Sequence, residues 1–304
     1  MQLNISNIFN LNKKQENLDF IDIIVNDDNL LFIDPRLIDI SSNMYAKEMK
    51  INIEFFWGEV LKNIRNKDIK TLYKTLSGLS EPNETRLGFA ISKKKGNSIS
   101  KKIKPKLIEA IQRNKAVQTG ILSDFADAEL FIEDIGPDRI SDITTKIIKS
   151  ELVKFTQEQC NSLKIPMEKV RQKDFFNRTT LKWEHKDVEL PTYAGKPIIF
   201  VPKDMVRLKG ASNSNLACFY RFAIRNFIIN DKDLIQDISP SGKDGVLQLK
   251  DVKAHYPLSK ESLSKWMIKH GKMLVDFKSD RLKEILRPLT DEQISEIVYN
   301  IEKV

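Results

Sequence analysis

The stretch Leu130-Phe-Ile-Glu-Asp-Ile-Gly-Pro-Asp-Arg-Ile-Ser-Asp142 decides the expected fold, because it passes from an apolar run through a turn into a helix. Its first three residues form a short apolar run, which favours a strand. The residues from Gly136 onward predict a turn, in which Ser141 or Asp142 caps a helix that runs to about Leu163. A strand that leads into a helix is typical of an α/β fold.

The flanking sequence extends this pattern. Phe20–Val25 and Leu30–Ile33 flank Asn26-Asp-Asp-Asn29, which predicts a hairpin. Apolar residues at helical spacing predict a long helix from about Asn43 to Arg65. Further expected elements are a strand over 197–201 and helices over 66–79, 105–116, 216–229 and within 261–304. We expect a mixed α/β fold, in which a small mixed sheet packed with helices spans 1–210 and a mostly helical region spans 211–304.

The composition predicts a soluble cytoplasmic protein. Of the 304 residues, 41% are hydrophobic and 30% are charged, which is typical of globular chains. No run approaches the roughly 18 to 20 apolar residues that span a bilayer, and the first twenty residues lack a secretion signal. Two cysteines, Cys160 and Cys218, suit a reducing compartment. We therefore expect no association with a membrane.

Positive charge is concentrated in one segment of the chain. Lysine and arginine outnumber acids 50 to 42, and Ser92–Lys106 contains no acid. This segment leads into a helix expected at Pro105, and helix N-termini attract phosphate. A solvated loop is the open alternative. The lysines predicted to contact a nucleic-acid backbone are Lys93, Lys94, Lys95, Lys101 and Lys102, and the segment also holds Lys104 and Lys106.

Several catalytic motifs are absent from the sequence. There is no Gly-x4-Gly-Lys-Ser/Thr loop, no Gly-x-Gly-x-x-Gly, no Gly-x-Ser-x-Gly and no His-Glu-x-x-His. These absences argue against P-loop nucleotide hydrolysis, dinucleotide chemistry, α/β-hydrolase chemistry and zincin chemistry. The three histidines are too few for a histidine-rich metal site.

The densest polar group follows the predicted strand at 130–132. Asp138, Arg139 and Asp142 place two carboxylates and a guanidinium within five residues, which suits the handling of a metal ion or a phosphate. We predict Asp138 and Asp142 as catalytic ligands of Mg²⁺. Arg139 is predicted to contact phosphate, and so is Arg86 in the polar segment Glu81–Gly88. Glu84 in the same segment is a further candidate site residue. Helix capping and surface ion pairing are the structural alternative for these residues.

Two more cations follow the strand expected at 197–201. Lys203 and Arg207 stand where a second phosphate contact is expected, with Lys203 as the catalytic lysine. Pro137-Asp138 also matches the first half of a nuclease pattern that ends in Asp/Glu-x-Lys. Roughly five such triplets are expected by chance in a chain of this composition, so the triplet alone does not identify a nuclease. Candidates are Glu184–Lys186, Asp251–Lys253 and Asp276–Lys278.

Four strings give the chain a resemblance to known proteins. Leu31–Pro35, Glu81–Gly88, Asp138–Asp142 and Val201–Lys203 together resemble a type of bacterial protein associated with mobile elements and antiphage-defence neighbourhoods. The resemblance covers about residues 18–210. It implies a defence component that acts with a partner gene product, and it implies no particular cofactor or catalytic residue.

Three functions follow from these observations. The first is a defence protein that engages nucleic acid, and a Mg²⁺-dependent nuclease is one form of this hypothesis. The second is a non-enzymatic subunit or sensor that binds a partner ATPase or effector in a defence complex, using the aromatic helix over 216–229 and the C-terminal helices. The third is a small-molecule enzyme in which Arg86 and Arg139 hold an anionic substrate.

Overall fold

The computed structural model describes residues 3–27, 29–88, 103–120, 122–133, 135–208, 211–282 and 286–299. The chain folds into two compact units, and each is formed by segments that lie far apart in the sequence. Unit 1 comprises 1–105, 137–209 and 288–304, and unit 2 comprises 106–136 and 210–287. The sequence-based division at residue 210 differs from these units at two places, because 106–136 joins unit 2 and 288–304 joins unit 1.

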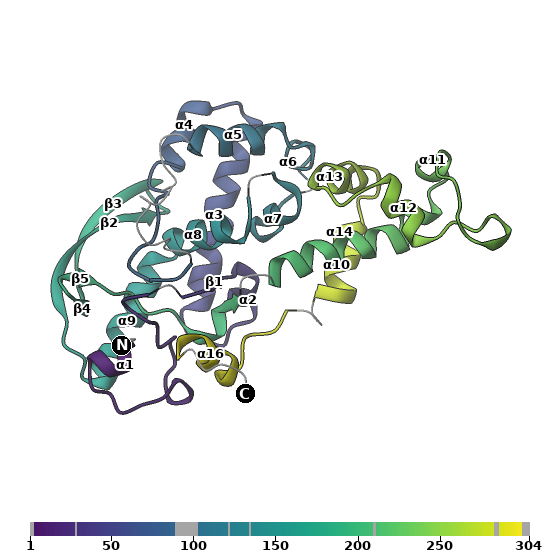
Figure 1. Cartoon of the computed structure of the whole chain (residues 1–304). Helices are drawn as coiled ribbons and strands as arrows, with labels where there is room; N and C mark the ends of the chain where they lie inside the picture. The colour runs from purple at the N-terminus through teal and green to yellow at the C-terminus, as the bar shows by residue number, and fades with distance from the viewer. Residues whose placement is uncertain are drawn as a thin grey trace. The chain divides into compact units, whose positions relative to one another are not determined.

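Unit 1 contains all the strands that are described (Figure 1). In the described residues these strands form three two-stranded antiparallel sheets, β1 with β6, β2 with β3, and β4 with β5. The strands are β1 (Leu31–Ile33), β2 (Glu168–Asn177), β3 (Lys182–Leu190), β4 (Thr192–Tyr193), β5 (Lys196–Pro197) and β6 (Val206–Leu208). The helices are α1 (Ile5–Ile8), η1 (Gln15–Asn17), α2 (Pro35–Ile40), α3 (Ala46–Arg65), α4 (Ile69–Thr75), α8 (Pro137–Ile147), α9 (Lys149–Leu163), η3 (Lys203–Met205) and α16 (Asp291–Val298).

Unit 2 is helical in its described residues. Its helices are α5 (Ile103–Arg113), which begins just before the unit, α6 (Lys115–Gln118), η2 (Phe125–Asp127), α7 (Ala128–Phe131), α10 (Ala211–Asn226), η4 (Ile228–Asn230), α11 (Lys232–Ile235), η5 (Lys243–Gly245), α12 (Leu249–His255), α13 (Lys260–Lys269), α14 (Met273–Phe277) and η6 (Lys278–Leu282). The expected mixed α/β class with helices in the C-terminal part is confirmed. Within the described part of the chain, no helix is long and apolar enough to cross a membrane.

Helix α8 lies at the centre of unit 1, where it contacts β1, β2 and α3 (Figure 1). Its apolar residues Ile140, Ile143 and Ile147 are buried, so one face of the helix belongs to the core. The Ser141 hydroxyl accepts a hydrogen bond from the Ile33 backbone N–H at 3.0 Å, which ties the helix to β1. Helix α8 is therefore held rigidly on the side that faces the sheet.

The hairpin predicted over 20–33 is wrong. Strand β1 pairs with β6, and Ile24 makes only an isolated bridge with Asn4. The buried Asn29 side chain explains the difference: its Oδ1 accepts from the Ile24 N–H at 2.8 Å, and its Nδ2 donates to the Ile24 carbonyl at 2.9 Å. A side chain thus satisfies the backbone groups that a hairpin partner would have satisfied.

Two further expected strands are also wrong. Leu130 and Phe131 lie in the short helix α7, since a short apolar run does not distinguish a strand from a buried helical turn. Ile198–Val201 lies outside any strand, because its N–H groups donate to unrelated partners. Ile199 donates to the Glu84 carbonyl at 2.9 Å, and Phe200 donates to the Thr156 hydroxyl at 2.9 Å.

Candidate functional site

Asp138, Asp142 and Lys146 form a polar stripe along α8. The predicted turn over 136–142 is wrong, because the helix already begins at Pro137, a residue that suits the first helical position. Residues four apart project from the same face of a helix, so these three side chains follow one another along it. The sequence-predicted pair Asp138 and Asp142 is therefore brought together, with Lys146 one turn further on.

The Asp142 carboxyl lies in an environment that resists its ionisation. Burial raises its pKa to about 8, and the nearby carboxylates of Asp138 and Glu81 add to this shift, while Lys146 and Arg139 partly offset it. No described residue donates a hydrogen bond to this half-buried side chain. At pH 7 the carboxyl therefore holds a proton that a bound cation could displace.

The loop that contains Glu81 and Glu84 approaches the N-terminus of α8. Gly88 ends the described part of this loop at φ +94, and its N–H donates to the Asn29 and Leu31 carbonyls at 3.0 and 3.1 Å. A methyl group at Gly88 would stand 3.6 Å from Asp138 Oδ1. The backbone of this loop is thus in close reach of the first carboxylate of the stripe.

A β-bulge in β2 supplies another carboxylate. The register of β2 with β3 shifts between Gln172 and Phe175, and within the bulge Asp174 adopts the left-handed conformation at φ 60. Its carboxylate accepts from the Ser80 hydroxyl at 3.0 Å and stands 3.9 Å from the Lys146 ammonium. Bulges redirect side chains in this way, often beside functional sites.

Lys149, in the first turn of α9, joins the parts of this cluster. Its ammonium donates to Glu84 Oε1 at 2.7 Å, to Gln172 Oε1 at 2.9 Å and to the Lys173 carbonyl at 3.0 Å. Although burial opposes ionisation of Glu84, the positive charges of Lys146 and Lys149 lower the pKa of that carboxyl. Lys149 thereby connects the loop, the bulge and the helix pair.

We call this group the α8 cluster. It consists of the five acids Glu81, Glu84, Asp138, Asp142 and Asp174 with the three cations Arg139, Lys146 and Lys149. Full ionisation would give it a net charge of −2, since five negative charges exceed three positive ones by two. Such an excess favours a divalent cation. Among the described residues no three His, Cys, Asp or Glu side chains stand together so as to hold a metal ion.

Two carboxylates are nevertheless enough for one common class of metal site. Mg²⁺ usually keeps several waters and binds one or two carboxylates together with phosphate oxygens of the substrate. Asp138 and Asp142 meet this requirement, because they are adjacent on one helix face and one of them is protonated in the absence of a cation. The residues present therefore fit magnesium.

The other predicted site residues lie away from the α8 cluster or outside the described residues. Lys203 pairs with Asp291 of α16 at 2.7 Å, and this ion pair occupies the ammonium that we predicted as catalytic. Arg207 is buried on β6 with its Nε 3.1 Å from Asp34, so it is not an exposed phosphate contact as predicted. Arg86 has φ 56, and its carbonyl accepts from Asn29 at 2.9 Å. The predicted contacts Lys93, Lys94, Lys95, Lys101 and Lys102 lie outside the described residues.

Sequence reasoning missed four members of the cluster: Glu81, Lys146, Lys149 and Asp174. A signal for Lys146 was present, because a helix that starts at Pro137 puts residues 138, 142 and 146 on one face. Asp174 gave no such signal. Its position depends on a bulge within a hairpin that the sequence does not predict, since both strands are rich in charged residues.

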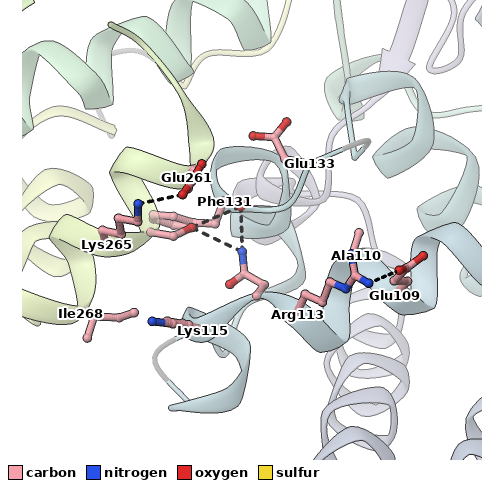
Figure 2. A pocket seen from close by; sticks show the side chains of 11 residues that line it. Glu109, Ala110, Arg113, Lys115, Phe131, Glu133, Glu261, Lys265 and Ile268 are labelled. Atoms are coloured by element: carbon pink, nitrogen blue, oxygen red, sulfur yellow. Dashed lines mark hydrogen bonds and ion pairs between the residues drawn. The ribbon is translucent and has the colours of Figure 1, made fainter. Parts of the chain in front are cut away.

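Unit 2 carries a separate groove of about 710 Å³ between α5, α6, α7 and α13 (Figure 2). Its rim bears two exposed ion pairs, Arg113 with Glu109 at 2.6 Å and Lys265 with Glu261 at 2.7 Å. Its floor is formed around the Phe131 carbonyl. Exposed pairs of this kind contribute little energy and carry no unusual chemistry.

The polar groups on that floor already satisfy one another. Asn114 Nδ2 donates to the Phe131 carbonyl at 2.8 Å, and the Ser264 hydroxyl donates to the same oxygen at 3.3 Å. The hydrogen bond from Lys265 lowers the pKa of Glu261, so this acid is ionised at neutral pH. The α8 cluster, with its raised carboxyl pKa and its buried lysines, is the stronger candidate for a reactive site.

A comparison with known protein families matches the first two thirds of the chain. No curated protein and no solved structure matches. Residues 10–213 match the family described as Domain of unknown function (DUF8370), and this stretch contains every residue of the α8 cluster. Because the match spans more than half of the 304 residues, the chain belongs to the DUF8370 family.

Proposed function

We propose that this protein engages nucleic acid and hydrolyses its phosphodiester bonds with Mg²⁺ at the α8 cluster. The observation that carries the proposal is the pairing of Asp138 with Asp142, whose pKa is raised to about 8 by burial and by neighbouring carboxylates. Asp138 and Asp142 would hold the ion. Magnesium in this position would neutralise charge on the scissile phosphate.

Nucleic acid is the proposed substrate because of the charge that adjoins the cluster in the sequence. Gly88, whose Cβ position is 3.6 Å from Asp138 Oδ1, precedes the acid-free lysine segment. Lys93 follows Gly88 by five positions in the sequence. Lysines near a metal site would attract a polyanion without reading its sequence.

The setting in bacterial antiphage defence, the partner protein and the cytoplasmic location rest on sequence reasoning alone and stay predictions. The raised carboxyl pKa and the buried lysines favour the catalytic hypothesis over the non-enzymatic subunit. Strongly perturbed pKa values gather at functional sites, and this tendency supports the catalytic hypothesis.

The test is a cleavage assay with purified full-length protein. Plasmid DNA and single-stranded RNA are incubated with Mg²⁺ or with EDTA, and products are resolved on gels. We expect Mg²⁺-dependent cleavage that falls at least about 100-fold in Asp138→Asn and in Asp142→Asn, since each loses a metal ligand.

Asp187→Asn is the matched control, because Asp187 is an exposed acid on β3 that pairs with Arg171 at 3.2 Å. This variant is expected to cleave like the wild type. Equal activity in all four proteins would assign the cleavage to a contaminant, and inert wild-type protein on both substrates would refute the proposal.

A further inference from the structure

The Lys146 side chain is buried, and its ammonium makes no hydrogen bond to a described residue. Its side chain is only 3% exposed, and its one ion pair, with Asp174, is long at 3.9 Å. No described residue accepts a hydrogen bond from it. An ammonium has three N–H donors. The Lys146 Nζ is not among the fully buried side-chain atoms that lack a partner, so these donors reach solvent and can bind water or a ligand.

The nearby Lys149 differs from Lys146, because its ammonium has acceptors for its hydrogen bonds. It is equally buried, at 3% exposed, and has three acceptors between 2.7 and 3.0 Å: Glu84 Oε1, Gln172 Oε1 and the Lys173 carbonyl. Lys146 lies in the last turn of α8 and Lys149 in the first turn of α9, yet the acceptors gather around only Lys149. Lys149 is thus structural, while the donors of Lys146 remain available.

We propose that Lys146 binds a non-bridging oxygen of the substrate phosphate, a role that rests on the proposed function. Asp142 lies one helical turn before Lys146, so an ion held by Asp138 and Asp142 would adjoin a phosphate oxygen held by Lys146. A water can fill this place in the free protein, and the phosphate oxygen would displace it. Lys146 then completes the neutralisation of a phosphate that the metal begins.

The experiment measures phosphate binding and magnesium binding separately, using the full-length protein. Inorganic phosphate is titrated with and without Mg²⁺ into the wild type, Lys146→Met and Lys146→Arg. In parallel, Lys146 Nζ is followed by NMR in ¹⁵N-lysine-labelled wild type, with its signal assigned through Lys146→Arg. The NMR arm does not depend on the folding of the methionine variant.

We expect phosphate to shift the Lys146 Nζ resonance and Lys146→Met to weaken phosphate binding at least about tenfold, which corresponds to the loss of one charge-assisted hydrogen bond. Lys146→Arg keeps the charge and should bind phosphate within about threefold of wild type. Magnesium binding should be unchanged or tighter in Lys146→Met, because removing a cation favours another cation. A merely structural lysine would not produce these opposite effects.

A Lys146 resonance that does not move at saturating phosphate would overturn the inference, and so would wild-type phosphate affinity in folded Lys146→Met. Magnesium-dependent cleavage with no phosphate response at Lys146 would refute this role and leave the proposed function standing. If phosphate binds at Lys146 but the protein cleaves neither DNA nor RNA, Lys146 is an anion site and the proposed function is refuted.

Discussion

Asp142→Asn is expected to raise the free energy of unfolding at pH 9 by up to about 5 kcal/mol, because asparagine resembles the protonated carboxyl and cannot ionise. The pKa of Asp142 is about 8 in the folded protein and has an ordinary value of 3.8. The folded state therefore binds the proton more tightly than the unfolded state. The stabilisation from Asp142 is complete below pH 3.8 and is lost as pH rises through about 8.

Chemical denaturation followed by circular dichroism from pH 4 to 9 measures this effect. The wild type should lose up to about 1.4 kcal/mol per pH unit relative to the variant across this range. Asp187→Asn replaces an exposed acid of the same unit, so its free energy of unfolding should follow that of the wild type at every pH. A constant difference between wild type and Asp142→Asn at all pH values would show that Asp142 ionises normally.

Lys149→Met should destabilise the protein by about 3 to 5 kcal/mol, because it breaks a buried ion pair and leaves its partners unsatisfied. Glu84, Gln172 and the Lys173 carbonyl would each lose a hydrogen bond of 2.7 to 3.0 Å. Adding Glu84→Gln should recover part of this loss, since the uncompensated carboxylate is then removed. Urea denaturation of the single and double variants measures the coupling.

Lys154→Met is the matched control on the same helix. Its side chain is 57% exposed and stands 3.9 Å from Glu151, so the change should stay within about 0.5 kcal/mol. Equal effects of the Lys149 and Lys154 variants would mean that Lys149 does not hold the loop, the bulge and the helix together.

The long helix shows what the sequence could predict. Apolar residues at helical spacing predicted a helix over about 43–65, and α3 spans Ala46–Arg65. Helices α5 and α10 likewise overlap the predicted helices over 105–116 and 216–229. The described residues of these helices bury apolar side chains at helical spacing, and this local periodicity is visible without knowledge of the partner.

The strands were less predictable because their partners are distant in the chain. β1 pairs with β6, about 175 positions away in the chain. The nearby segment Phe20–Val25, which was the expected partner, does not pair with β1, because the Asn29 side chain binds the backbone groups of Ile24. The hairpin of β2 and β3 lacks a clear apolar alternation, since it is half exposed and contains a bulge. Hydrogen bonding by one asparagine and one bulge cannot be read from residue types.

In the candidate site, too, residues close in sequence were predicted correctly and long-range pairing was not. Asp138 and Asp142 were predicted because they are close in sequence, and the helix keeps them adjacent. Lys203 was predicted from its place after an expected strand, but Asp291, which is 88 positions away, pairs with it instead. Long-range pairing of charges therefore decides which of the candidate residues share the site.

Magnesium binding at Asp138 and Asp142 is tested most directly by proton release. Mg²⁺ is titrated at pH 7 into metal-free wild type and Asp142→Asn, and released protons are counted with a pH-stat. Since the pKa of Asp142 is about 8, binding should release nearly one proton per ion in the wild type and almost none in the variant. Equal proton release by both proteins, or magnesium binding of equal affinity, would contradict the assignment of the metal to the α8 cluster.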